Sequence, residues 1–107
     1  MRRVGWQMQV RKDKVEVYKE AHRNVWPEVL AALSKHGWHR YSIFMDENAM
    51  VFGYLETDAD FDTALAGFVS EEVVGRWAES IGDLVGIPAG GDARDVIVEL
   101  EEVFHLD

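Results

Sequence analysis

Cysteine is absent from this 107-residue chain, so neither a disulfide nor a thiolate metal site can contribute to its fold or chemistry. No apolar run approaches the roughly 20 residues that a membrane-spanning helix needs. Arg2 and Arg3 near the N-terminus are followed by an alternating polar pattern, where a signal peptide would have an apolar core. These absences favour a soluble protein without membrane association, and they are compatible with a cytoplasmic location.

Basic residues are few as well. Lys and Arg total 11 against 20 Asp and Glu, which gives a net charge of −9, and no cluster of Lys and Arg interleaved with aromatic residues offsets it. Because such a surface repels a phosphate backbone, nucleic acid is not an expected partner. The remaining composition, 48% hydrophobic and 29% charged residues, is that of an ordinary globular protein, and the length predicts one domain over residues 1–107.

Hydrophobic periodicity divides the N-terminal third into a strand and an interrupted helix. Residues 3–10 alternate between apolar and other positions, which predicts a strand. Its apolar face is formed by Val4, Trp6, Met8 and Val10. The segment from Asp13 to Glu16 has the form of a capping box, so we expect a helix to begin at Asp13. Pro27 should break this helix and restart it, and Gly37 should end it in a left-handed conformation.

The rest of the chain alternates between the same two periods. The expected elements are strands at 38–46 and 50–57, a short helical region at 58–68, a helix capped by Ser70 with its apolar side over residues 73–84, and a last strand at 96–104. The glycine-rich segment 86–92 lacks the lysine and the helix context of a phosphate-binding loop. We therefore interpret it as a linker.

The resulting order, β-α-β-β-α-β, predicts an α+β protein with a ferredoxin-like, split βαβ fold. In this fold helices cover one face of a four-stranded antiparallel sheet and leave the other face open. The middle strands carry apolar residues on both faces, among them Phe44, Phe52 and Tyr54. Because pairing with a second copy would cover the open apolar face, we expect a homodimer.

His22 is the strongest candidate for chemistry. The i, i+4 spacing places it beside Tyr18 on the apolar stripe of the first helix. Histidine changes its protonation near neutral pH, so it can give and take protons next to a phenol. The alternative is a core histidine satisfied by a backbone carbonyl, and spacing leaves both interpretations open. Tyr41 and Trp77 have flat faces suited to stacking on a sugar, although aromatic residues at apolar positions are often plain core.

Two further patterns predict no site. His36 and His39 have a spacing found in metal pairs, but they straddle the helix end at Gly37 and no third ligand lies nearby in the sequence. The acidic residues Glu99 and Glu101 alternate along the last strand, which indicates a solvated face rather than the paired carboxylates of a glycosidase. We therefore expect no metal.

Several motifs together resemble the L-rhamnose mutarotase family over about residues 3–106. They are Met8-Gln9-Val10, Tyr18-x-x-x-His22-x-x-x-Trp26-Pro27-Glu28, His36-Gly37-x-His39-x-Tyr41-x-Ile43 with Asp46, Arg76-Trp77 and Glu101-Glu102-Val103-Phe104. The resemblance implies a dimeric α+β barrel without a cofactor. It also implies an isomerase of rhamnose metabolism, which interconverts the α and β anomers of L-rhamnose or a related 6-deoxy sugar by acid/base ring opening.

The resemblance also implies residue roles, with His22 as the proton donor and with Tyr18, Tyr41 and Trp77 lining the sugar site. One departure concerns the residue after Trp77. The family carries a Trp-Trp pair where this chain has Trp77-Ala78, so one wall of the pocket is smaller and the preferred aldose is left open. The general base and any exchange of the C-terminal strand between subunits are open too.

Three alternatives remain at the level of sequence. A cofactor-independent monooxygenase can have a similar fold, and fold alone does not separate it from a mutarotase. A non-catalytic dimeric module could bind a small ligand on the same surfaces. A mutarotase for a different aldose is the third, and Ala78 favours it among the three.

Overall fold

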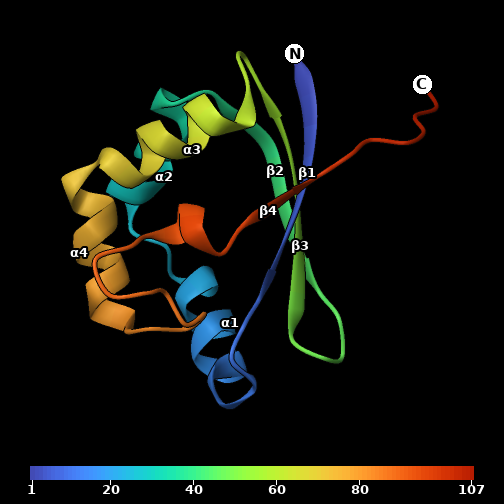
Figure 1. Ribbon diagram of the computed structural model, residues 1–107. Coiled ribbons are helices and arrows are strands. Elements are labelled where there is room, and N and C mark those ends of the chain that lie inside the picture. Colours follow the sequence, from blue (N-terminus) through green and yellow to red (C-terminus); the bar gives the residue numbers. More distant parts are fainter.

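The computed structural model describes residues 1–107 (Figure 1). Its strands are β1 (Arg2–Gln9), β2 (Trp38–Met45), β3 (Met50–Thr57) and β4 (Val98–Leu100). Its α-helices are α1 (Val15–Arg23), α2 (Pro27–Lys35), α3 (Phe61–Ser70) and α4 (Glu72–Ile81), and short 3-10 helices, η1 (Lys12–Lys14) and η2 (Ala93–Asp95), precede α1 and β4.

The four strands form one antiparallel sheet in the order β2-β3-β1-β4. All the helices lie on one face of this sheet (Figure 1). This arrangement confirms the predicted ferredoxin-like α+β fold. The first strand, β1, lies inside the sheet and pairs with the last strand, β4, which forms one edge. None of the helices is long and apolar enough to cross a membrane.

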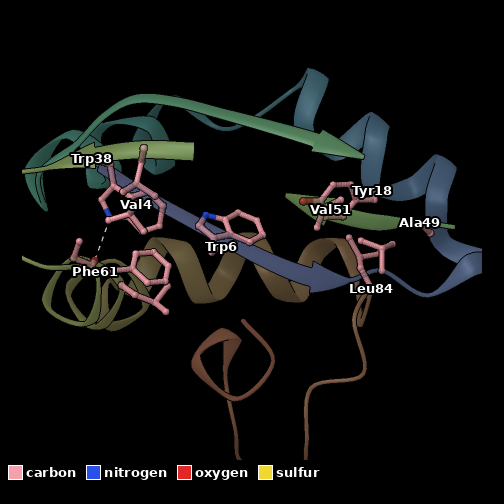
Figure 2. Close-up of a cluster of buried hydrophobic side chains, with 12 residues drawn as sticks. Val4, Trp6, Tyr18, Trp38, Ala49, Val51, Phe61 and Leu84 are labelled. Atoms are coloured by element: carbon pink, nitrogen blue, oxygen red, sulfur yellow. Dashed lines mark hydrogen bonds between the residues drawn. The ribbon is translucent and has the colours of Figure 1, made fainter. Parts of the chain in front are cut away.

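The main core lies between the sheet and the helices (Figure 2). The predicted alternation of β1 is confirmed, since Val4 and Trp6 are buried on the helical side, as is Val10 just after the strand. On β3, Val51 and Leu55 are buried on the same side. Each such side chain contributes roughly 1.5–3 kcal/mol by leaving water, so the core fixes which face of the sheet the helices cover.

The two helices that follow β1 are separated as predicted, but the first begins differently. Trp26 is extended (φ −61°, ψ 138°) before Pro27 opens α2, and Gly37 has a φ of 80° after α2. The predicted capping box is wrong, because α1 begins at Val15 without any side-chain cap. The chain enters α1 through η1, so Asp13 lies within that turn and its carboxylate is 3.6 Å from Arg11 Nε.

The region after β3 contains two helices of similar length, where the sequence suggested a short turn and one longer helix. The predicted Ser70 cap is wrong, since Ser70 is the last residue of α3 and its hydroxyl donates to the Gly67 carbonyl at 2.7 Å. The side chain that caps α3 is Asp60, which accepts from the Thr63 N–H at 2.7 Å. Ser70 is thus satisfied inside the preceding turn, and an extended Glu71 separates α3 from α4.

The last strand is shorter than predicted. β4 pairs with β1 over three residues, from Val98 to Leu100, and residues 101–107 form no regular structure. Arg3 holds the start of this tail through a two-pronged ion pair with Glu102 (2.7 and 2.9 Å). Beyond it the tail extends away from the body of the protein, where Phe104 is 80% exposed (Figure 1).

Candidate active site

A cavity of about 460 Å³ lies between the sheet and the helices. This volume is in the range of small-molecule sites, and 20 of its 22 lining residues are hydrophobic. The lining comes from β1, β2, all four α-helices, the connection between α1 and α2, and the segment from α4 through η2 to β4. The four predicted site residues, Tyr18, His22, Tyr41 and Trp77, all line this cavity.

Helix α1 orients His22 through its own backbone. The Nδ1 atom of His22 lies 2.8 Å from the Tyr18 carbonyl oxygen, one helical turn earlier. A carbonyl only accepts, so this contact requires the proton on Nδ1 and leaves Nε2 as the nitrogen that can gain or lose a proton. The Tyr18 and His22 rings lie with their centroids 4.2 Å apart. His22 therefore makes the hydrogen bond to a backbone carbonyl that we expected of a core histidine, yet it lines the cavity.

His22 is exposed, whereas the sequence placed it on a buried stripe; only Tyr18 is buried there. The difference arises because α1 ends at Arg23, so its last turn lies at the rim of the core. An exposed residue that also lines the cavity marks the place where the cavity opens to solvent. Proton exchange with water is therefore available to His22.

Trp77 reaches His22 from α4, a helix distant in the sequence. The two ring centroids are 5.8 Å apart and the planes meet at 78°, so the edge of one ring faces the other. Ala78 also lines the cavity and is exposed. Position 78, where the sequence comparison with the family suggests a departure, is therefore part of the cavity wall in this chain.

The two phenols of the cavity remain neutral at physiological pH. Burial raises the pKa of Tyr18 to about 12, and burial raises the pKa of Tyr41 further still. A neutral phenol can both donate and accept a hydrogen bond. Tyr18 and Tyr41 are thus suited to binding hydroxyl groups, and neither is poised to act as a phenolate base.

The loop after α4 forms a wall that sequence reasoning missed. The sequence predicts a linker at residues 86–92, yet Ile87 in this segment and Val85 just before it line the cavity. The carboxylate of Asp83 organises the loop by accepting from the N–H groups of Val85, Gly86 and Ile87 at 3.2, 2.8 and 3.1 Å. These bonds lower the pKa of Asp83. An Asp three residues before a Gly is a local turn signal that could have indicated an ordered loop.

The histidines outside the cavity pair with separate carboxylates. His36 Nε2 lies 2.8 Å from Glu71 Oε1, and His39 Nε2 lies 3.1 Å from Asp58 Oδ2. No group of three or more His, Asp or Glu side chains is arranged to hold a metal ion. The cavity lining likewise contains no carboxylate, lysine or arginine.

Fold and cavity together define an α+β domain with an aromatic, small-molecule-sized site in which one histidine can exchange protons. The model of the L-rhamnose mutarotase family matches residues 3–106, and the chain belongs to this family of carbohydrate isomerases.

Relatives over the full length support this assignment. The chain is 39% identical to the L-rhamnose mutarotase of Bacillus subtilis and 32% identical to that of Pectobacterium atrosepticum, and each match covers 100% of both chains. The crystal structure of an L-rhamnose mutarotase from Formosa agariphila superimposes with a TM-score of 0.81 at 28% identity, again over 100% of both chains.

A second group of structures shares the fold alone. A putative antibiotic biosynthesis monooxygenase from Nitrosomonas europaea matches with a TM-score of 0.56 at 17% identity, over 92% of this chain and 84% of that one. The monooxygenase alternative therefore rests on the shared architecture alone.

Proposed function

We propose that this protein interconverts the α and β anomers of L-rhamnose, or of a closely related 6-deoxy aldose, with His22 as the proton donor. The observation that carries the proposal is the bond between His22 Nδ1 and the Tyr18 carbonyl at 2.8 Å, which leaves Nε2 free beside the cavity. The reaction itself is taken from the family, since the full-length relatives bear the name L-rhamnose mutarotase.

The reaction consists of proton transfers around one carbon–oxygen bond. Protonated His22 gives its Nε2 proton to the ring oxygen as the bond between that oxygen and the anomeric carbon breaks. The anomeric hydroxyl loses its proton to a base and becomes the aldehyde carbonyl. After rotation about the adjacent carbon–carbon bond the steps reverse on the other face. Nothing is oxidised or reduced, so this chemistry needs neither a metal nor a nucleotide.

Water at the cavity opening is our assignment for the base. No carboxylate lines the cavity, and the raised pKa values of Tyr18 and Tyr41 keep both phenols protonated. The exposed position of His22 gives the anomeric end of a bound sugar access to solvent. The phenols of Tyr18 and Tyr41 would hold sugar hydroxyls, while the indole of Trp77 would pack against the C–H surface of the ring.

We also propose that the protein acts as a cytoplasmic homodimer, paired through the open face of the sheet. Phe44, Phe52 and Leu100 are 65%, 37% and 39% exposed on this face, and Phe44 lies directly opposite Phe52 in the register of β2 and β3. A second copy would cover this apolar surface and offer contacts to the exposed tail. Sedimentation equilibrium should give twice the chain mass, and a monomer at micromolar concentration would contradict the pairing.

The catalytic proposal is tested by saturation-transfer NMR on equilibrated L-rhamnose, with one anomeric proton irradiated and the other observed. The intact protein should accelerate exchange, and His22→Gln should lower the catalysed rate by roughly 100- to 10,000-fold, the usual contribution of a general acid. His39→Gln is the matched control, because His39 pairs with Asp58 outside the cavity, and it should exchange at the wild-type rate.

Two outcomes separate the parts of this proposal. Wild-type exchange in His22→Gln would exclude His22 as the proton donor while leaving the activity in place. If the intact protein accelerates anomer exchange neither of L-rhamnose nor of other 6-deoxy aldoses, the mutarotase function is excluded and a binding module is favoured.

A further inference from the structure

Trp6 carries the buried side-chain polar atom of this protein that lacks a hydrogen-bond partner, its indole Nε1. The side chain is 2% exposed. Another core indole, that of Trp38, donates to the Ala64 carbonyl at 3.1 Å. Because an unmatched buried donor costs free energy, an orphaned N–H in a lined cavity calls for an explanation in terms of what the cavity binds.

The register of the sheet determines where the Trp6 indole can reach. Trp6 lies opposite Gly53 on β3, and the nitrogen edge of the indole covers the position where a Cβ of residue 53 would be. The absence of a side chain at Gly53 lets the indole extend over β3, which separates β1 from β2. Tyr41 lies on β2, and the Trp6 and Tyr41 ring centroids are 6.4 Å apart at an interplanar angle of 51°. Figure 2 shows Trp6 near the middle of the core cluster.

Because the Trp6 N–H is buried, it can affect a bound ligand only indirectly. Trp6 lines the cavity with other atoms of its side chain, but its Nε1 has no accessible surface and cannot touch a sugar there. The N–H can still act through a neighbouring residue of the lining. Tyr41 is that neighbour. We infer that Trp6 is a positioning residue that donates its N–H to the Tyr41 hydroxyl oxygen when sugar is bound, so that the Tyr41 O–H is directed at a sugar hydroxyl. This inference rests on the proposed function.

The state of Tyr41 fits this role. Burial raises the pKa of Tyr41, so its phenol keeps the proton that it would donate to the sugar. The Trp6 indole acts in the opposite direction and lowers the pKa of Tyr41, so the indole and the phenol are close enough to influence each other. One oxygen that accepts from Trp6 and donates to the sugar would use both of its hydrogen-bonding capacities.

A double-mutant cycle tests the inference. Trp6→Phe removes the N–H and keeps an aromatic ring. It should lower kcat/KM for L-rhamnose by roughly 3- to 10-fold, the value of one neutral hydrogen bond, mainly through a higher KM. In the Tyr41→Phe background the same substitution should change kcat/KM by less than about 2-fold, because the group through which Trp6 acts is already gone.

Stability measurements separate positioning from simple packing. Trp38→Phe removes the same atoms from another core indole but also leaves the Ala64 carbonyl without its donor, so its Tm should fall further than that of Trp6→Phe. If Trp6→Phe does not fold, the isosteric benzothienylalanine analogue of Trp6, which keeps both rings and lacks the N–H, replaces it in the cycle.

Four results are decisive. An equal loss of kcat/KM with and without the Tyr41 hydroxyl would overturn the inference, and so would no loss at all. If the wild-type protein binds L-rhamnose without accelerating exchange, the proposed function fails, and dissociation constants of the same four proteins decide the role of Trp6. If it does not bind the sugar either, both proposals are overturned.

Discussion

Gly53 is expected to be the glycine that tolerates substitution least. Trp6 lies directly opposite it, and a methyl group at position 53 would overlap the Cε2, Nε1 and Cζ2 atoms of the Trp6 indole. The indole is 2% exposed and packed in the main core, and it also lines the cavity, so a displaced ring would lose core contacts and intrude on the site. Gly53→Ala must therefore displace either the indole or the strand.

The expected loss of stability follows from the free-energy cost of overpacking the core and from the stabilisation lost when the indole is displaced. Overpacking a core costs typically 1–3 kcal/mol, and complete removal of a buried Trp or Phe side chain costs about 3–5 kcal/mol. Alanine also lowers the conformational entropy of the unfolded chain, which offsets about 0.4–1 kcal/mol of this loss of stability. We expect Gly53→Ala to lower the free energy of unfolding by about 2–3 kcal/mol, which is a fall in Tm of roughly 10–20 °C for a domain of this size.

Gly75 offers the matched control. It lies within α4, is exposed, and a Cβ there would meet no atom within 4 Å. Gly75→Ala should raise the free energy of unfolding by about 0.5–1 kcal/mol, because alanine favours a helix interior. Urea and thermal unfolding, followed by circular dichroism at one protein concentration, should thus show a lower free energy of unfolding for Gly53→Ala and a higher one for Gly75→Ala. A Gly53→Ala protein as stable as the wild type would refute the packing argument.

Two further predictions concern the cavity wall and acid stability. Ala78→Trp should lower KM for L-rhamnose by roughly 2- to 10-fold, because an added indole would give about 0.5–1.5 kcal/mol of aromatic contact. The same substitution should slow the anomer exchange of bulkier aldoses. Unchanged KM values across a sugar panel would place position 78 outside the sugar site. Lys35 and then His36 lower the pKa of Glu71 below its ordinary value of 4.5, so the stability that this carboxylate contributes is present above about that pH and is lost as the pH falls through the lowered pKa. Glu71→Gln should therefore flatten the fall of the urea midpoint between pH 5 and 3, and an unaltered acid profile would show that the ion pair does not contribute.

Local sequence patterns determined most of the secondary structure and one half of the site. The alternation along β1 and the break before Pro27 follow from the period of apolar residues and from the geometry of proline, so both were predictable. The pairing of Tyr18 with His22 likewise follows from one turn of a helix. Motif resemblance added the family, because several spaced residues in one order identify it better than any residue alone.

Tertiary structure decided what those residues can do. Trp77 stands beside His22 only because α4 lies near α1, and the loop from Asp83 becomes a cavity wall because its residue Leu84 is buried in the core. The exposure of His22 and the reach of Trp6 across Gly53 depend on strand order and on where a helix ends. Periodicity reports which face of an element is apolar, whereas contacts between distant elements depend on how those faces pack, and one sequence pattern permits several packings.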